Sequence, residues 1–289
     1  MGLVGVCVGS FLNCVVYRLE SGKSLKGRSF CPHCKHTLVW TDLFPVFSFL
    51  FLGGKCRYCK KKISWQYPLV ELATGVIFLL IFLVSLRTSP QASVAIQGMC
   101  AKPLDCFVAP LLAMTFLFYV TSALIIVFIY DLKHYIIPDK VLFPAIGIVA
   151  VYRIFENLVI LNWALNSNFK FQISNFTSLF GYLLAAVIAS GFFLAIFLVT
   201  RGRGMGFGDV KLAVLMGLLL GLPNVLAALF LAFFFGAIIG VILMIFGKKS
   251  AGWRMKSEIP FGPFLIAGTF IAMLWGEQLI GWYLRLFLI

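Results

Sequence analysis

Charged residues are scarce in this sequence: Asp, Glu, Lys and Arg make up 12% of its 289 residues, whereas 62% are hydrophobic. A water-soluble globular domain usually carries about twice that charged fraction. The composition therefore excludes a soluble globule with a polar shell and predicts a protein whose main solvent is lipid. The N-terminal apolar run also lacks a charged leading region, so we expect the first helix to remain as an anchor and not to be a cleaved signal peptide.

Apolar runs recur along the chain at the length that a membrane helix requires. Crossing about 30 Å of hydrocarbon takes roughly 20 residues at about 1.5 Å per residue. The sequence therefore predicts an all-α polytopic membrane protein with about eight transmembrane helices. The candidate spans are residues 1–17, 68–86, 107–130, 141–161, 177–200, 209–222, 225–246 and 263–284.

A polar insert, residues 18–67, interrupts the apolar pattern and carries two Cys-x-x-Cys pairs. We divide the chain into a first transmembrane helix (1–17), this small module (18–67) and a helical membrane domain (68–289). Two such pairs can supply the four thiolates of a structural Zn²⁺ site with no open coordination position. The alternative is two disulfides or a redox pair, which the reducing cytoplasm disfavours. The predicted zinc ligands are Cys31, Cys34, Cys56 and Cys59.

Acidic residues are also few, ten against 24 basic ones, which gives a formal charge of +14. Such an excess can indicate a nucleic-acid partner, but here the basic residues fall in short loops, where they set membrane orientation. We therefore predict no nucleic-acid partner and place segments 18–67, 131–140, 201–211 and 248–262 in the cytoplasm, with both termini outside. The opposite side then keeps only Arg87, Lys102, Lys170 and Arg285.

Two of the few carboxylates are functional candidates, because an Asp near the bilayer centre costs about 2.5 to 3.5 kcal/mol. Asp131 ends the third long span, and Asp209 follows the fifth in a segment with Gly204, Gly206 and Gly208. Both are predicted at the cytoplasmic edge of the bilayer. The glycines allow a substrate strand to approach closely. The span after them reaches only roughly 21 Å, which is too short to cross the bilayer. We therefore expect the glycine loop to lie below the membrane surface, either buried in protein or lining a water-filled cavity.

Two neighbouring carboxylates that share one proton can hydrolyse a peptide bond, one acting as base and the other as acid. The alternative is that Asp131 and Asp139 flank or cap helix ends and that Asp209 is an N-cap. The shared depth, the glycine loop and the short span favour catalysis for Asp131 and Asp209. For Asp139, which follows Pro138, we favour the capping interpretation.

Several motifs occur in a fixed order along nearly the whole chain. They are Gly9-Ser10-Phe11-Leu12-Asn13, the four-Cys module with Trp40-Thr41-Asp42-Leu43-Phe44-Pro45, Tyr67-Pro68-Leu69-Val70-Glu71, the segment from Asp131 to Ile137-Pro138-Asp139, and the segment from Gly204 to Asp209. In this series the sequence resembles the type IV prepilin peptidases, bifunctional leader peptidases and N-methyltransferases of the GxGD type of membrane aspartyl protease.

The resemblance implies an enzyme of the bacterial inner membrane that acts on type IV prepilins and pseudopilins. It would cut after the glycine of the basic leader and N-methylate the new N-terminal residue with S-adenosylmethionine, in association with the zinc module. Asp131 and Asp209 align with the catalytic pair. The expected site loop comprises Gly204, Gly206, Gly208, Lys211, Pro138 and Asp139, within the segments 131–139 and 204–211.

The sequence departs from the family pattern in three places. Gln66 stands where relatives usually have a basic residue, the polar loop 162–175 lengthens the interval between the two aspartates, and the first helix is short. No donor-binding fingerprint is present, so the residues that bind S-adenosylmethionine are not predicted. The alternatives are a peptidase that lacks methylation, which the intact four-Cys module disfavours, and a transporter, for which we find neither inverted repeats nor a midplane site.

Overall fold

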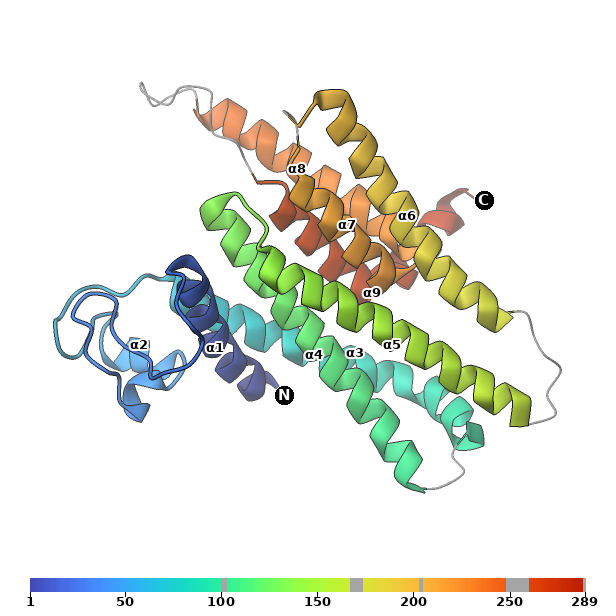
Figure 1. Ribbon diagram of the computed structural model, residues 1–289, viewed down its shortest axis with the longest axis horizontal. Coiled ribbons are helices and arrows are strands. Elements are labelled where there is room, and N and C mark those ends of the chain that lie inside the picture. The colour runs from blue at the N-terminus through green and yellow to red at the C-terminus, as the bar shows by residue number, and fades with distance from the viewer. Residues whose placement is uncertain (100–102, 167–173, 203–204, 248–259, 288–289) are drawn as a thin grey trace. The chain divides into compact units, whose positions relative to one another are not determined.

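The computed structural model describes residues 1–99, 103–166, 174–202, 205–247 and 260–287. Within these ranges the regular structure is helical, and extended backbone pairs only in two isolated bridges, Phe30 with Thr37 and Lys55 with Lys62. The predicted all-α class is therefore confirmed. In chain order (Figure 1) the elements are α1 (Gly2–Glu20), the 3-10 helix η1 (Trp40–Leu43), α2 (Phe47–Phe51), α3 (Gln66–Met99), α4 (Pro103–His134), α5 (Asp139–Asn166), α6 (Ser174–Thr200), α7 (Phe207–Leu220), α8 (Asn224–Gly247) and α9 (Gly262–Phe287).

In the described part of the chain, 7 helices are long and apolar enough to cross a membrane, namely α1, α3, α4, α5, α6, α8 and α9. α7 has 14 residues, which reach only about 21 Å at about 1.5 Å per residue. Each predicted span thus coincides with a helix, and the span predicted to be too short, 209–222, forms α7. The first helix continues to Glu20, past its predicted end at residue 17.

The chain divides into two compact units, Met1–Ile126 and Val127–Ile289. In the first unit, α1 packs along α3. A Cβ built on Gly9 would lie 2.8 Å from the Cα of Glu71, so glycine is needed for this close approach of the two helices. Phe78 of α3 stacks on Phe118 of α4, with 4.4 Å between the ring centroids.

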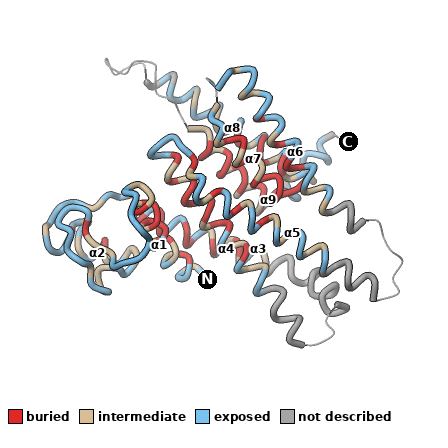
Figure 2. Tube along the Cα trace, in the orientation of Figure 1, coloured by how far each residue is buried: buried red, intermediate tan, exposed pale blue. Residues whose placement is uncertain are grey.

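In the second unit, α7 is buried along most of its length, and Figure 2 shows buried residues gathered on it. Leu212, Leu215 and Met216 are fully enclosed, and α7 as a whole packs against α5, α6 and α9. A helix that is apolar on all sides is stable when other helices surround it. α7 is therefore an internal helix, and it carries Asp209 in its first turn.

The other end of α7 is held by Arg153 of α5. The Arg153 guanidinium donates to the carbonyl of Leu218 (3.2 Å) and to that of Leu219 (2.6 Å). It also pairs with Glu156 at 2.7 Å and lies 3.9 Å from the centroid of the Tyr182 ring. Terminal helix carbonyls have no partner within the helix, and in a membrane they must find one in the protein. Arg153 supplies that partner, so α7 can end without crossing the bilayer.

Candidate functional site

The two aspartates of the predicted dyad both belong to the second unit, and each lies near the end of a helix. Asp131 is in the last turn of α4, which the chain leaves through Tyr135 in a left-handed conformation (φ 56). Asp209 is in the first turn of α7, whose N-cap is Gly206. Both carboxylates are buried: Asp131 is 4% exposed and Asp209 7%. Two acidic groups from distant parts of the sequence are thus both withdrawn from solvent.

Gly262, the first residue of α9, brings the two carboxylates into one place. Its backbone N–H faces the Asp131 carboxylate. A Cβ built on Gly262 would overlap Oδ2 of Asp131 and would lie 3.7 Å from Oδ1 of Asp209. Both carboxylates therefore lie close to the Cα of Gly262. Gly262 was not predicted as a site residue, although a glycine directly before Pro263 at the start of a predicted span is typical of a helix N-terminus.

The glycine loop supports the second aspartate. The N–H of Gly206 lies close to the Asp209 carboxylate, and a Cβ built on Gly206 would be 3.9 Å from Asp209 Oδ2. Gly208 packs against the segment that links α4 and α5, because a Cβ there would be 3.1 Å from the Cβ of Ile137. The predicted loop residue Gly204 lies outside the described residues.

Asp139 and Lys211 form an ion pair between α5 and α7. Lys211 Nζ donates to Asp139 Oδ1 at 2.7 Å and to Oδ2 at 2.9 Å. Asp139 lies in the first turn of α5, where a negative charge stabilises the helix, and the Pro138 carbonyl accepts the first N–H bonds of that helix. The helix-end position expected for Asp139 is thus observed, and the ion pair is an addition that the sequence did not predict.

The arrangement suits acid–base chemistry on a water molecule. Two carboxylates that lie close together in a buried place share a proton more readily than both ionise, so one can accept a proton while the other donates one. The first turn of α7 also presents the positive end of a helix dipole, which favours negative charge at Asp209. Neither carboxylate forms an ion pair among the described residues.

The four predicted metal ligands come together in the first unit. The Sγ atoms of Cys31, Cys34, Cys56 and Cys59 all lie within 4.8 Å of one another, and those of Cys31 and Cys59 are 3.9 Å apart. A tetrahedral Zn²⁺ with Zn–S bonds of about 2.3 Å places its sulfurs about 3.8 Å apart. The donor set therefore fits zinc.

The local backbone explains why the thiols converge. The two Cys-x-x-Cys pairs form turns of the same kind. In each turn the residue after the second cysteine, Lys35 or Lys60, has a positive φ, and its backbone N–H donates to the carbonyl of the first cysteine, Cys31 or Cys56. Burial raises the pKa of the Cys31 thiol, but hydrogen bonds from the backbone N–H groups of Cys34 and His33 outweigh it and lower that pKa to about 7. The thiolate, which is the form that binds metal, is thereby favoured.

Two protein-family models match the chain. The model described as Bacterial Peptidase A24 N-terminal domain matches residues 3–85, a range that includes the four cysteines. The model described as Type IV leader peptidase family matches residues 118–241, which include Asp131 and Asp209.

Similar proteins match along almost the full length. A protein from Bacillus subtilis (strain 168), named Prepilin leader peptidase/N-methyltransferase, is 30% identical over 98% of this chain and 96% of its own. Proteins of the same name from Pseudomonas aeruginosa (31% identical over 98% of this chain and 92% of its own) and Aeromonas hydrophila (29% over 99% and 93%) are similar too. No solved structure matches significantly. The resemblance inferred from the motifs is confirmed.

Proposed function

This chain belongs to the type IV leader peptidase family, and on that premise we propose that it removes the basic leader from type IV prepilins and pseudopilins and then methylates the new N-terminus. The single observation that best supports the peptidase activity is the meeting of Asp131 and Asp209 beside Gly262. Two buried carboxylates that share one small space have no evident structural purpose, because their mutual repulsion costs stability.

In the proposed reaction, Asp131 and Asp209 hold a water molecule between them. The ionised carboxylate takes a proton from the water as its oxygen attacks the carbonyl carbon after the leader glycine. The protonated carboxylate donates its proton to the developing oxyanion, and the two exchange roles when the C–N bond breaks. The products are the free leader peptide and a mature pilin with a new amino terminus.

The proposed substrate path follows from the surroundings of the dyad. In this proposal an extended peptide lies along the glycine loop beside Asp209, and the ion pair of Lys211 with Asp139 is the charged part of the site loop. The helix dipole at the start of α7 favours the charge changes at Asp209 during the reaction. We place Pro138 in this loop as the residue that starts α5.

We place the protein in the bacterial inner membrane as a multi-pass protein, with the dyad and the four-Cys module in or at the cytoplasm. The excess of basic residues in the segments next to both sites supports this orientation. A basic leader remains on that side while the apolar pilin helix stays in the bilayer. The scissile bond then lies at the boundary, at the level of Asp131 and Asp209.

For the methyltransferase activity, we propose that S-adenosylmethionine is the methyl donor and that Cys31, Cys34, Cys56 and Cys59 bind a structural Zn²⁺. When bound, the ion fixes the fold of the module and leaves no open position for chemistry. The intact cysteine cluster is the observation that favours the bifunctional enzyme over a relative with peptidase activity alone.

The test of the dyad is cleavage of a membrane-embedded prepilin by the purified wild type, Asp131→Asn and Asp209→Asn. Asn has nearly the same shape as Asp but cannot act as a general base, so each variant should cleave at least about a hundredfold more slowly. The product mass reports both the cut after the leader glycine and any added methyl group. Glu277→Gln, which neutralises an exposed carboxylate of α9, is the matched control and should cleave normally. Cleavage at the wild-type rate by either Asn variant would remove that aspartate from the mechanism.

A further inference from the structure

The four-Cys module has a hollow of about 360 Å³ on its surface that takes no part in the proposed reactions. Its lining combines aromatic and aliphatic residues, among them Phe49, Leu50 and Trp65, with two lysines, Lys55 and Lys62. Among the described residues, no acidic side chain lines it. The volume lies in the range of about 300 to 1,000 Å³ that small-molecule sites occupy. The hollow therefore joins an apolar wall to charge of one sign.

The backbone holds the two lysines side by side. Lys55 and Lys62 lie opposite each other in an isolated antiparallel bridge. Two backbone hydrogen bonds flank this pair, from Cys56 N–H to the Lys61 carbonyl at 2.9 Å and from Ile63 N–H to the Gly54 carbonyl at 2.7 Å. Residues opposite each other between two such bonds have Cα atoms about 4.5 Å apart and side chains on the same face. The two ammonium groups therefore leave the backbone on one face and at close range.

This pair of like charges has no negative partner in the described part of the chain. No ion pair involves Lys55 or Lys62 there, and residues 55–62 hold five basic side chains and no acidic one. Like charges directly opposite each other destabilise a bridge. An anion between the two ammonium groups removes that repulsion, and a phosphate group is an anion that lysine binds well. The pair is therefore suited to a phosphate.

The apolar wall indicates what the phosphate is attached to. Leu50 is 64% exposed and Trp65 69%. The Trp65 ring rests edge-on against Phe49, with 4.9 Å between centroids, and Phe49 packs on Gly54, where a Cβ would lie 3.1 Å from the Phe49 ring. A free phosphate leaves Leu50 and Trp65 exposed to water, whereas the apolar part of an amphiphilic ligand covers them. The hollow thus fits the headgroup region of a lipid.

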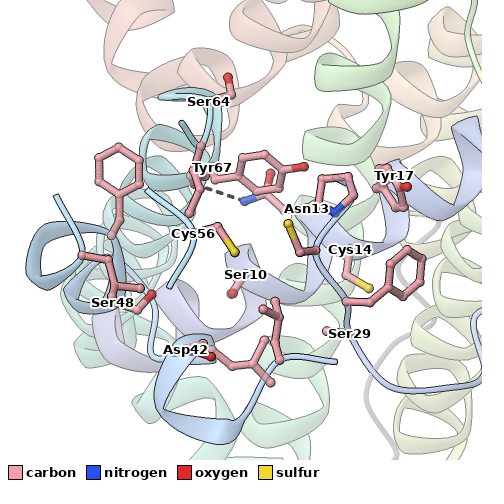
Figure 3. Close-up of a pocket in the computed structure, with 18 of the residues that line it drawn as sticks. Ser10, Asn13, Cys14, Tyr17, Ser29, Asp42, Ser48, Cys56, Ser64 and Tyr67 are labelled. Atoms are coloured by element: carbon pink, nitrogen blue, oxygen red, sulfur yellow. Dashed lines mark hydrogen bonds between the residues drawn. The ribbon is translucent and has the colours of Figure 1, made fainter. Parts of the chain in front are cut away.

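The hollow lies next to the point where the chain enters a membrane helix. Trp65 directly precedes α3, of which Gln66–Ser85 is apolar enough to cross a membrane, and tryptophan is enriched at membrane interfaces. A larger cavity of about 410 Å³ lies between α1 and the four-Cys module. Across it, Asn13 Nδ2 of α1 donates to the Tyr67 carbonyl at 3.1 Å (Figure 3). The start of α3 is thereby tied to a second helix of membrane-spanning length.

We propose that Lys55 and Lys62 bind the phosphate of an anionic phospholipid whose apolar part lies against Leu50 and Trp65. This contact docks the four-Cys module on the membrane surface at the start of α3. Basic segments beside a membrane helix are attracted to anionic lipid. A lipid is favoured over an acidic soluble protein because the adjoining helix keeps the hollow at a high effective concentration of lipid. The inference does not depend on either proposed reaction.

The test compares two double variants of equal charge in the full, zinc-loaded chain, reconstituted in nanodiscs. Lys55→Gln with Lys62→Gln removes the pair, whereas Lys26→Gln with Lys60→Gln removes two other exposed lysines of the same module. Hydrogen exchange of residues 53–65 is followed in discs of phosphatidylcholine and in discs with about 30% phosphatidylglycerol. For the wild type and the Lys26/Lys60 control, phosphatidylglycerol should slow exchange at least about threefold, because a ligand stabilises the structure that it binds. The Lys55/Lys62 variant should lose most of this slowing.

Exchange in phosphatidylcholine discs checks the fold, since loss of the pair should not make the Lys55/Lys62 variant exchange faster there than the wild type. Lys55→Gln alone should remove at least half of the slowing; Lys62 also lines the larger cavity, but Lys55 does not. No slowing in the wild type, full slowing in the Lys55/Lys62 variant, or equal loss in both double variants would overturn the proposal. Inorganic phosphate added to phosphatidylcholine discs should give no slowing, and slowing equal to that by phosphatidylglycerol would show a site for free phosphate and not for lipid.

Discussion

The proposed catalytic centre depends on one residue that has no side chain. Gly262 leaves room for the Asp131 carboxylate, since a Cβ there would occupy the position of an Asp131 oxygen and would lie 3.7 Å from Oδ1 of Asp209. The Gly262 N–H also faces the Asp131 carboxylate. The absence of a side chain at Gly262 thus lets the two carboxylates lie near the same point.

Substitution Gly262→Ala should lower kcat/KM for prepilin cleavage at least about a hundredfold, because the added methyl group pushes Asp131 away and misplacement by about 1 Å costs that much. Gly281→Ala in the same helix is the matched control, because a Cβ at that position has no neighbour within 4 Å. Cleavage rates on one prepilin and thermal unfolding in detergent check both variants. Equal activity of the two variants would contradict the contact between Gly262 and the dyad.

At the scale of single residues, the sequence predicted which Asp and Cys residues form the two sites. It did not predict which other residues position them. Asp131 and Asp209 could be predicted because a carboxylate next to hydrocarbon is costly and therefore informative, and the four cysteines could be predicted from their spacing. Gly262 could not be, because a glycine contact depends on which segment packs opposite it.

At the scale of elements, the lengths of the helices were predictable because they follow from the thickness of the bilayer. The short span became α7, and the remaining spans became full-length helices. The sequence also showed Arg153 inside a span, but not its partners, because a charged residue in a membrane helix implies a partner without naming it. The structure identifies those partners as the last carbonyls of α7.

Substitution Arg153→Met should destabilise the protein by about 1 to 3 kcal/mol, because it leaves two buried carbonyl groups without donors. Since α7 carries Asp209 at its opposite end, the cleavage rate should fall as well. Arg153→Lys keeps the charge but not the two-pronged geometry and should lie between the wild type and Arg153→Met. Thermal unfolding and cleavage are measured together, with Arg285→Met, an exposed arginine of α9, as control. If Arg153→Met is as stable as Arg285→Met, Arg153 does not support α7.

At the scale of the whole molecule, the two sites belong to different parts of the chain. The cysteine cluster and the cavity beside it lie within Met1–Ile126, and the dyad with Gly262 lies within Val127–Ile289. The module has little other structure to hold it, since its described elements between α1 and α3 are η1, α2 and two isolated bridges. Such small modules usually fold only with their metal.

Removal of zinc should therefore separate the two activities. A chelator, or Cys31→Ser, should abolish methyl transfer because the four-Cys module loses its fold. Prepilin cleavage should stay within about fivefold of the wild type, since a local change in one unit is expected to leave a separate packed unit largely intact. Zinc content by mass spectrometry, methylation and cleavage are followed in one preparation. Cys7→Ser, an exposed thiol outside the cluster, is the control and should leave all three unchanged. A parallel loss of cleavage and zinc would show that the module also supports the dyad, and the division of the activities between the two units would then be wrong.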